Sequence, residues 1–203
     1  CALPICQPVP DPLTFQVPPG NILAILGPSG CGKSTLLSTI AGVIPALSGS
    51  VTLNGRDITS IATAQRRAAL VFQEPLLFPH LNVRDNVAYG PRRRGLSRAA
   101  ARAEADRLLD WVDLASLASS ASDQLSGGQA QRVALARAFA AKPEVLCLDE
   151  PFSALDPPLR RRLAADVVDF VRTSKVPAIH VTHDPQEADS LAASTPDGSI
   201  LSM

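Results

Sequence analysis

The sequence predicts an α/β fold in which a parallel sheet is interrupted by a helical insertion. Two observations predict it: short, wholly apolar runs typical of buried strands, and a long Ala- and Arg-rich stretch with regularly spaced leucines between them. The chain has 203 residues, 46% of them hydrophobic, which suits one domain with a substantial core. This composition argues against a disordered chain.

The apolar runs place the strands. Four are predicted to be buried strands of the parallel sheet: Ile22–Leu26, Ala69–Phe72, Val145–Leu148 and Ala178–Val181. A weaker strand signal lies at Leu13–Val17, after a proline-rich start. Ser50–Leu53 followed by Asn54-Gly55 predicts one more strand and a tight turn.

Two stretches are predicted to be helical. Lys33–Ala41 follows a Gly-rich loop, and Val83–Ala140 has the leucine spacing of helices within a subdomain of about residues 74–140. The arginine clusters Arg92–Arg94 and Arg160–Arg162 are interpreted as solvated helix faces. The helical subdomain is therefore expected as an insertion in the α/β core.

Charge and composition exclude several classes of protein. Lys and Arg number 19, as do Asp and Glu, so there is no basic excess to neutralise a nucleic acid. No apolar run approaches the roughly 20 residues needed to span a bilayer, so any membrane link is expected to run through a partner. The start has no basic region, and we do not interpret it as a signal peptide.

The four cysteines show neither metal-site spacing nor a dense disulfide framework. They are Cys1, Cys6, Cys31 and Cys147. Cys1 and Cys6 could pair, but we favour free thiols in a reducing cytosol.

Gly27–Thr35 fits the phosphate-loop pattern G-x-x-x-x-G-K-[ST] between a strand and a helix. Its glycines let backbone N–H groups turn inward, and the helix N-terminus favours an anion. Lys33 is expected to reach the β- and γ-phosphates and the Ser34 hydroxyl to ligate Mg²⁺. The predicted nucleotide-binding residues are Gly27, Pro28, Ser29, Gly30, Cys31, Gly32, Lys33, Ser34 and Thr35.

Two acids and a histidine follow predicted strands. Asp149 and Glu150 end the apolar run at Val145–Leu148; Asp149 is the candidate Mg²⁺ ligand and Glu150 the candidate general base. His183 follows the last run, at the sheet edge where ligands bind, and is expected to contact the γ-phosphate. A surface acid remains the alternative for Glu150.

The segment Leu125–Gln129 narrows the class of protein. Ser126 offers a hydroxyl, Gly127 and Gly128 expose amides, and a helix starts there, so this is a second anion site. Two phosphate-binding helix starts are explained if two copies sandwich each nucleotide. The alternative, a helix merely capped by Ser126, leaves the double glycine unexplained.

With these motifs in order, residues Leu13 to about Ala188 closely resemble the ATP-binding-cassette (ABC) ATPases. Gly27–Thr35 is similar to the Walker A loop, Val145–Asp149 to Walker B and Leu125–Gln129 to the signature. Gln73 resembles the Q-loop glutamine, Ser153–Asp156 the D-loop and His183 the switch histidine.

This resemblance implies that residues 1–203 form one ABC ATPase domain, which hydrolyses ATP with Mg²⁺. It also implies that two copies close around ATP as a head-to-tail homodimer. It implies that Gln73 touches Mg²⁺ or the water, and that Asp156 communicates across the dimer. It further implies transmembrane permease subunits, a solute-binding protein acting indirectly, and a cytoplasmic, peripheral place at the inner membrane face. The stretch Pro75–Val83 resembles that of bacterial importer ATPases, where a groove receives a coupling helix.

The sequence also departs from the family. Cys1–Pro10 contains no aromatic residue where the family stacks one on adenine, so we expect GTP to be accepted nearly as well as ATP. A binding titration showing a large preference for ATP would contradict this. The antiparallel β part is expected to be reduced, the tail after Ala188 is short, and no C-terminal regulatory domain is expected.

Two other functions stay open at this point. One is a non-transport ABC ATPase acting in DNA repair or translation, although this chain has a single cassette and no long heptad insertion. The other is a non-catalytic nucleotide-binding module, against which Lys33, Asp149, Glu150 and His183 argue.

Overall fold

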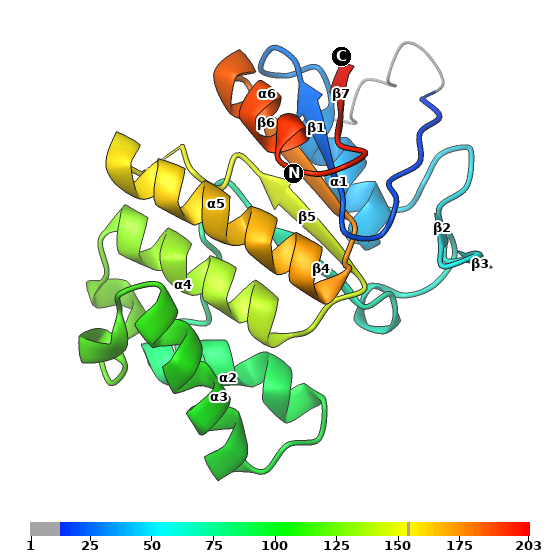
Figure 1. Ribbon diagram of the computed structural model, residues 1–203. Coiled ribbons are helices and arrows are strands. Elements are labelled where there is room, and N and C mark those ends of the chain that lie inside the picture. The colour runs from blue at the N-terminus through cyan, green and yellow to red at the C-terminus, as the bar shows by residue number, and fades with distance from the viewer. Residues whose placement is uncertain (1–12, 154) are drawn as a thin grey trace, which may run out of the picture. The chain divides into compact units, whose positions relative to one another are not determined.

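The computed structural model describes residues 13–153 and 155–203, and these divide into two compact units (Figure 1). The first unit holds the described residues up to Leu70, together with 144–150 and 168–203. The second holds 71–143 and 151–167 apart from Ala154. The segment Cys1–Pro10, on which the expected nucleobase selectivity depends, lies outside the described residues.

The main sheet has five strands in the order β4-β5-β6-β1-β7 (Figure 1). Its strands are β1 (Ile22–Leu26), β4 (Ala68–Val71), β5 (Val145–Asp149), β6 (Ala178–Thr182) and β7 (Ser199–Ser202). The pairs β5–β6, β6–β1 and β1–β7 are parallel. A separate antiparallel pair, β2 (Thr52–Leu53) and β3 (Arg56–Asp57), turns at Asn54-Gly55, where both residues have positive φ. The predicted α/β core and reduced antiparallel part are confirmed.

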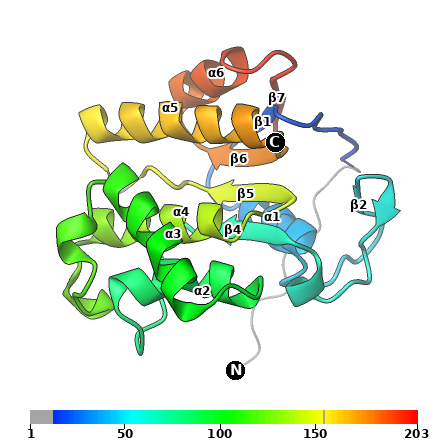
Figure 2. The ribbon, with the colours of Figure 1, turned by 60° about the horizontal axis from the view of Figure 1, so that its bottom comes forward.

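Helices cover both faces of this sheet in the first unit. Helix α1 (Lys33–Ala41) packs on β5 and β6, whereas α6 (Pro185–Ala193) packs on β1, β6 and β7, and Figure 2 shows the two on opposite faces. Leu37 and Ile40 of α1 pack with alternate strand residues such as Leu23 and Ile179. The predicted strand at Leu13–Val17 is wrong: these residues pair with no strand, and Phe15 and Val17 pack against the core instead.

Arg66 fixes the far end of helix α1. Its guanidinium, only 5% exposed, donates to the carbonyls of Thr39 and Ile40 at 2.7 and 3.0 Å and to those of Thr59 and Ile61. A cation at a helix C-terminus is favourable because the last carbonyls are unpaired. The helix ends at Gly42, where a Cβ would collide with this guanidinium. Arg66 thereby holds the C-terminal end of the helix that follows the Gly-rich loop.

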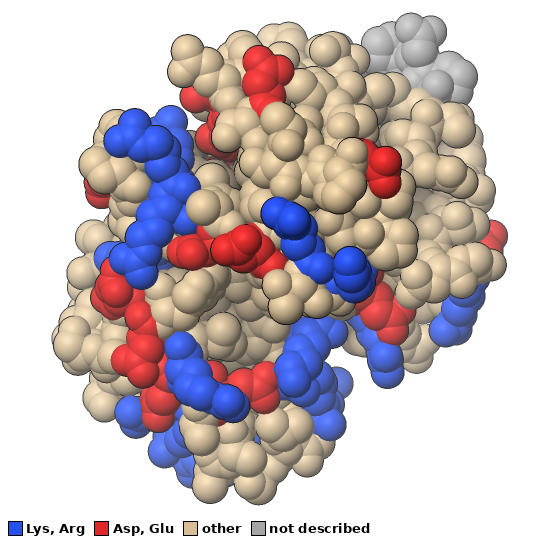
Figure 3. Space-filling model, in the orientation of Figure 1, with Lys and Arg blue, Asp and Glu red and all other residues tan. Residues whose placement is uncertain are grey.

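The second unit is helical at its centre. Helices α2 (Val83–Arg93), α3 (Arg98–Trp111) and α4 (Gly127–Ala140) pack against one another. Helix α5 (Pro157–Ser174) is divided between the two units. Among the described residues, the 3₁₀ turns Ala115–Leu117 and Ser122–Gln124 belong to the second unit and Thr63–Gln65 to the first. On the face shown in Figure 3, basic and acidic side chains are interspersed.

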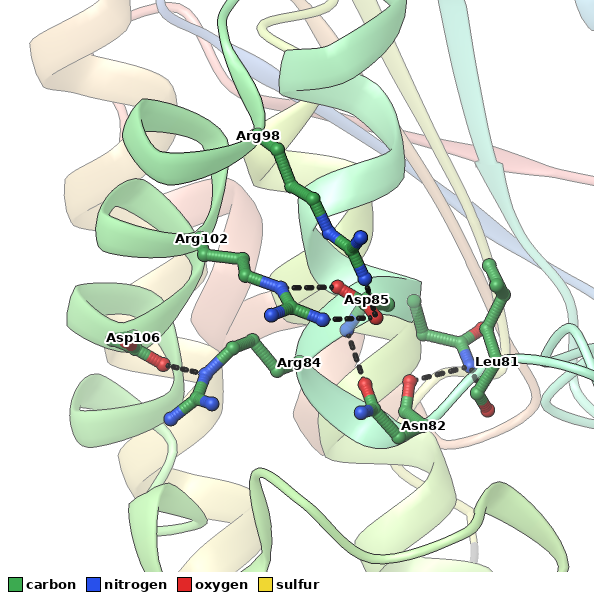
Figure 4. A network of polar contacts seen from close by, with 8 residues as sticks. Leu81, Asn82, Arg84, Asp85, Arg98, Arg102 and Asp106 are labelled. Carbon is green, nitrogen blue, oxygen red and sulfur yellow. Dashed lines mark hydrogen bonds and ion pairs between the residues drawn. The ribbon is translucent and has the colours of Figure 1, made fainter.

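Ion pairs join α2 to α3 in this unit (Figure 4). Arg102 binds both carboxylate oxygens of Asp85, at 2.8 and 2.7 Å, and Arg84 binds Asp106 at 2.6 Å. Asn82 caps α2 by accepting a hydrogen bond from the Asp85 amide. The hydrogen bond from Arg102 holds the pKa of Asp85 below its ordinary value.

A pH-dependent stability follows from Asp85. Because its folded-state pKa is lowered, its contribution is present above the unfolded value of 3.8 and is lost as the pH falls through the folded value. We expect Asp85→Asn to cost about 1 kcal/mol at pH 7, and the difference from wild type to shrink below pH 3.8. Urea unfolding at pH 7 and at a pH below 3.8 measures this difference in the free energy of unfolding. Asp110→Asn, an exposed position on α3, is the control, and a pH-independent difference would contradict the account.

Candidate active site

The loop between β1 and α1 is the candidate anion site. Gly30 and Gly32 have φ of +85° and +102°, a conformation that suits glycine and is typical of loops whose backbone N–H groups bind anions. No side chain caps α1 and no acid lies in its first turn, so its orphan N–H groups are left for a ligand. The Gly27 Cα lies against the Met203 carbonyl and the Cys31 sulfur, where a Cβ would come within 2.7 and 2.9 Å.

Lys33 supplies the cation of this loop. Its side chain is 5% exposed, and its Nζ donates to the carbonyls of Gly27 and Pro28 at 2.8 Å each. No carboxylate within the part of the chain that the structure describes forms an ion pair with it. A buried ammonium whose contacts are two carbonyls and the Cys31 sulfur, at 3.8 Å, is well suited to phosphate oxygens.

Ser34 and Asp149 bring two oxygen ligands together. Asp149 ends β5 and is 6% exposed. Burial raises the pKa of Asp149, while a hydrogen bond from Ser34 and the charge of Lys33 act in the opposite direction. A hydroxyl beside a buried carboxylate fits Mg²⁺, which prefers hard oxygen ligands and would offset the desolvation of the carboxylate.

Glu150 and His183 lie in contact at the ends of neighbouring strands. His183 Nδ1 is 3.0 Å from Glu150 Oε2, with the histidine side chain 60% exposed and the glutamate 12%. Glu150 has a φ of +45°, and its amide donates to the Val181 carbonyl. A left-handed non-glycine residue costs on the order of 1 kcal/mol, and such strain clusters at functional sites.

The strand order explains why these groups meet. The loop follows β1, Asp149 and Glu150 end or follow β5, and His183 follows β6, three consecutive strands of one parallel sheet. Their carboxyl ends therefore lie at the same sheet edge, where ligands bind in such folds. His180, the histidine within β6, is buried, and its Nε2 pairs with Glu187 of α6 at 2.5 Å, so we interpret it as structural.

The remaining predicted residues belong to the second unit. Gln73 is exposed just after β4, and Asp156 caps α5 by accepting from the Leu159 amide at 3.1 Å. Ser126 forms a capping box with Gln129 at the start of α4. Capping uses Ser126 Oγ as an acceptor and leaves its O–H free to donate. A Cβ on Gly127 would meet nothing within 4 Å, so intramolecular packing does not explain this glycine.

Sequence reasoning missed two residues beside these motifs. Arg66 donates to a carbonyl at the C-terminal end of α1, and Gln131 of α4 donates to the Phe72 carbonyl, next to Gln73. A polar residue within the apolar face of a helix is a signal for Gln131. For Arg66 the sequence holds no such signal, because its four acceptors come from separate segments.

The comparisons with known proteins agree with this fold. The sequence profile of the ABC transporter family matches residues 10–153, and the chain belongs to that family. It is 48% identical over 182 residues to the sulfate/thiosulfate import ATP-binding protein CysA of Mycobacterium tuberculosis, covering 90% of this chain and 52% of the relative. It is 44% identical over 180 residues to the Fe(3+) ions import ATP-binding protein FbpC of Agrobacterium fabrum, covering 89% and 51%. The chain thus spans about half the length of these relatives.

Solved structures give the same fold. The dimeric ATP-binding cassette MJ0796 bound to ADP and Pi superposes with a TM-score of 0.81 at 31% identity, over 88% of this chain and 81% of that one. Within the described residues, no helix has both the length and the apolar character needed to cross a membrane.

The thiol of Cys31 offers a direct probe of this loop. It is partly exposed and lies 3.8 Å from Lys33 Nζ, whereas Cys147 is buried and its pKa is raised by burial to about 12. We expect N-ethylmaleimide to alkylate Cys31 and block nucleotide binding, and ATP at ten times its Kd to slow this about tenfold by mass action. Peptide mass spectrometry measures the alkylation of each cysteine separately, and the buried Cys147 serves as the unreactive control. Equal alkylation of Cys31 with and without ATP would disprove the assignment.

Proposed function

We propose that this chain binds ATP with Mg²⁺ and hydrolyses it to energise solute import through a membrane permease. The observation that carries the proposal is the set of groups at one sheet edge: the Lys33 loop, the Ser34–Asp149 pair and the Glu150–His183 pair. Residues 1–203 are proposed as one ATPase domain, with about 74–140 as its helical subdomain. The names of the relatives, import ATP-binding proteins, support import.

Binding uses the triphosphate end of the nucleotide. The loop amides and Lys33 hold the β- and γ-phosphates, while Ser34, Asp149 and Gln73 are the proposed Mg²⁺ ligands. The metal, when bound, neutralises charge on the phosphate oxygens. Most of the catalysis is then positioning and charge stabilisation.

Proton transfer falls to Glu150. Its carboxylate, 12% exposed, accepts a proton from the attacking water as general base. His183 holds that carboxylate through Nδ1 and leaves its other ring nitrogen for the γ-phosphate. We propose that Gln73 orients the water or the metal.

A second copy of the chain completes the site. We assign Ser126, Gly127, Gly128 and Gln129 of one copy to the γ-phosphate bound by the other, with Asp156 at the same interface. The open space over Gly127 and the unused O–H of Ser126 support a ligand arriving from outside the chain. Relatives of this fold with a dimeric structure support a homodimer.

The permease is proposed to dock on the second unit near Pro75–Val83. Leu76 and Tyr89 are exposed there, at 57% and 43%, and Phe78 stacks on Tyr89 with the Arg137 guanidinium over its ring. Exposed apolar side chains of this kind favour a protein partner. A solute-binding protein would act indirectly through the permease. We therefore propose a cytoplasmic location at the inner face of the membrane, and we expect no role in nucleic-acid binding.

Phosphate release from ATP by the purified chain tests the proposal. We expect turnover that requires Mg²⁺, disappears in EDTA and is lost in Asp149→Asn, and co-purification with an integral membrane protein. ATP binding without any turnover would indicate a nucleotide sensor. Turnover without a membrane partner would indicate a non-transport ATPase.

A further inference from the structure

Gln131 is a buried amide in the helix that begins at the signature segment. It is the fifth residue of α4, is 1% exposed, and its Nε2 donates to the Phe72 carbonyl at 3.2 Å. Phe72 follows β4 and is bonded directly to Gln73. This hydrogen bond therefore ties the α4 helix to the peptide that precedes Gln73, within the second unit.

The carboxamide is held in one orientation at a cost. Rotating it by 180° would place Oε1 against the Phe72 carbonyl oxygen, so the donor must face Phe72. Oε1 is then buried and finds no hydrogen-bond partner in the described part of the chain. A buried unpaired acceptor is destabilising, whereas an apolar side chain of similar volume would fill this space without that cost. Packing alone does not explain an amide at position 131.

We propose that Gln131 is a positioning residue, which keeps Gln73 and the signature segment Ser126–Gln129 in fixed register. The bond to Phe72 makes any shift of α4 displace the peptide of Gln73, and the reverse. Gln73 acts on Mg²⁺ or the attacking water, and Ser126–Gln129 act on the nucleotide of the other copy, so one amide connects the two contacts. This inference rests on the proposed function.

Gln131→Met tests the link, because methionine keeps the volume and removes the donor. We expect kcat for phosphate release to fall about tenfold, since small misplacements of catalytic groups are costly. The Kd for ATP in EDTA should stay within about twofold, because that binding does not depend on Gln73 or the metal. Gln124→Met, at an exposed position outside the helix, is the control for replacing a glutamine by methionine. A lowered Tm with unchanged kcat would reduce Gln131 to a purely structural role.

A double-mutant cycle with Gln73→Ala separates positioning from stability. If Gln131 acts through Gln73, Gln131→Met has almost no further effect on kcat in the Gln73→Ala background. Equal effects in both backgrounds overturn the proposal, since a structural role does not depend on the Gln73 side chain.

A binding measurement keeps this test separate from that of the proposed function. If the wild-type chain hydrolyses no ATP, the proposed function fails, and the ratio of ATP Kd in EDTA to that in Mg²⁺ becomes the readout. Gln131→Met is then expected to shrink this ratio only where Gln73 is intact. A ratio that Gln131→Met leaves unchanged, with Gln73 intact, overturns the inference.

Discussion

Replacing Glu150 by glutamine is expected to abolish ATP hydrolysis while leaving ATP binding intact. Glutamine keeps the size of the side chain and an oxygen for His183, which lies 3.0 Å from the carboxylate, but it cannot take a proton from water. General-base catalysis contributes about 10²–10⁴-fold, so phosphate release should fall at least about 100-fold. The phosphate loop is untouched, and the Kd for ATP should remain near the wild-type value.

Phosphate release and equilibrium ATP binding, measured on the same preparation, check this prediction. Glu144→Gln is the matched control, because Glu144 precedes β5 and pairs with Arg67 at the surface. If Glu150→Gln hydrolysed ATP at the wild-type rate, another group would have to be the base.

Replacing Lys33 by methionine is expected to remove nucleotide binding itself. Nζ is the buried cation of the loop, and its two hydrogen bonds to the Gly27 and Pro28 carbonyls hold it against the loop backbone. Charge-assisted hydrogen bonds are worth about 1.5–3 kcal/mol each, so losing two to phosphate oxygens weakens ATP binding about 100-fold or more.

Titration of ATP by calorimetry measures the loss. Lys175→Met removes an exposed lysine of the same unit and should bind ATP as wild type does. Unfolding of Lys33→Met should stay cooperative, because methionine fills the space of the lysine stem. Wild-type affinity in Lys33→Met would mean that the loop does not hold the phosphates.

The buried strands could be predicted closely because a parallel strand covered on both faces is a plain apolar run. Ile22–Leu26 is observed as predicted, and the strands at Val145 and Ala178 each extend one polar residue further, to Asp149 and Thr182. The edge strand β7, Ser199–Ser202, was not predicted, because its four residues, two of them apolar, are too short a signal and become a strand by pairing with β1. Leu13–Val17 has strand-like residues but no partner, and tertiary packing overrides that preference.

The residues of the candidate site also divide into those that a local sequence pattern predicts and those that depend on a contact between distant segments. Asp149, Glu150 and His183 could be found because each lies at or next to the end of a recognisable strand, and Lys33 because the phosphate-loop pattern contains it. Gln131 lies 59 positions from its partner Phe72, and no local pattern reports that contact. The sequence therefore predicts the groups that meet the nucleotide better than the groups that hold them in place.

Mixing two inactive variants tests most directly whether each active site is shared between two copies. Lys33→Met disables the loop, and Gly127→Asp puts a negative charge where the signature meets phosphate, in open space that tolerates the new side chain. In a mixed dimer one composite site keeps both wild-type halves. An equal mixture should regain phosphate release at about a quarter of the wild-type rate, because random assortment makes half of the dimers mixed. A mixture no more active than the two variants measured separately would contradict a shared site.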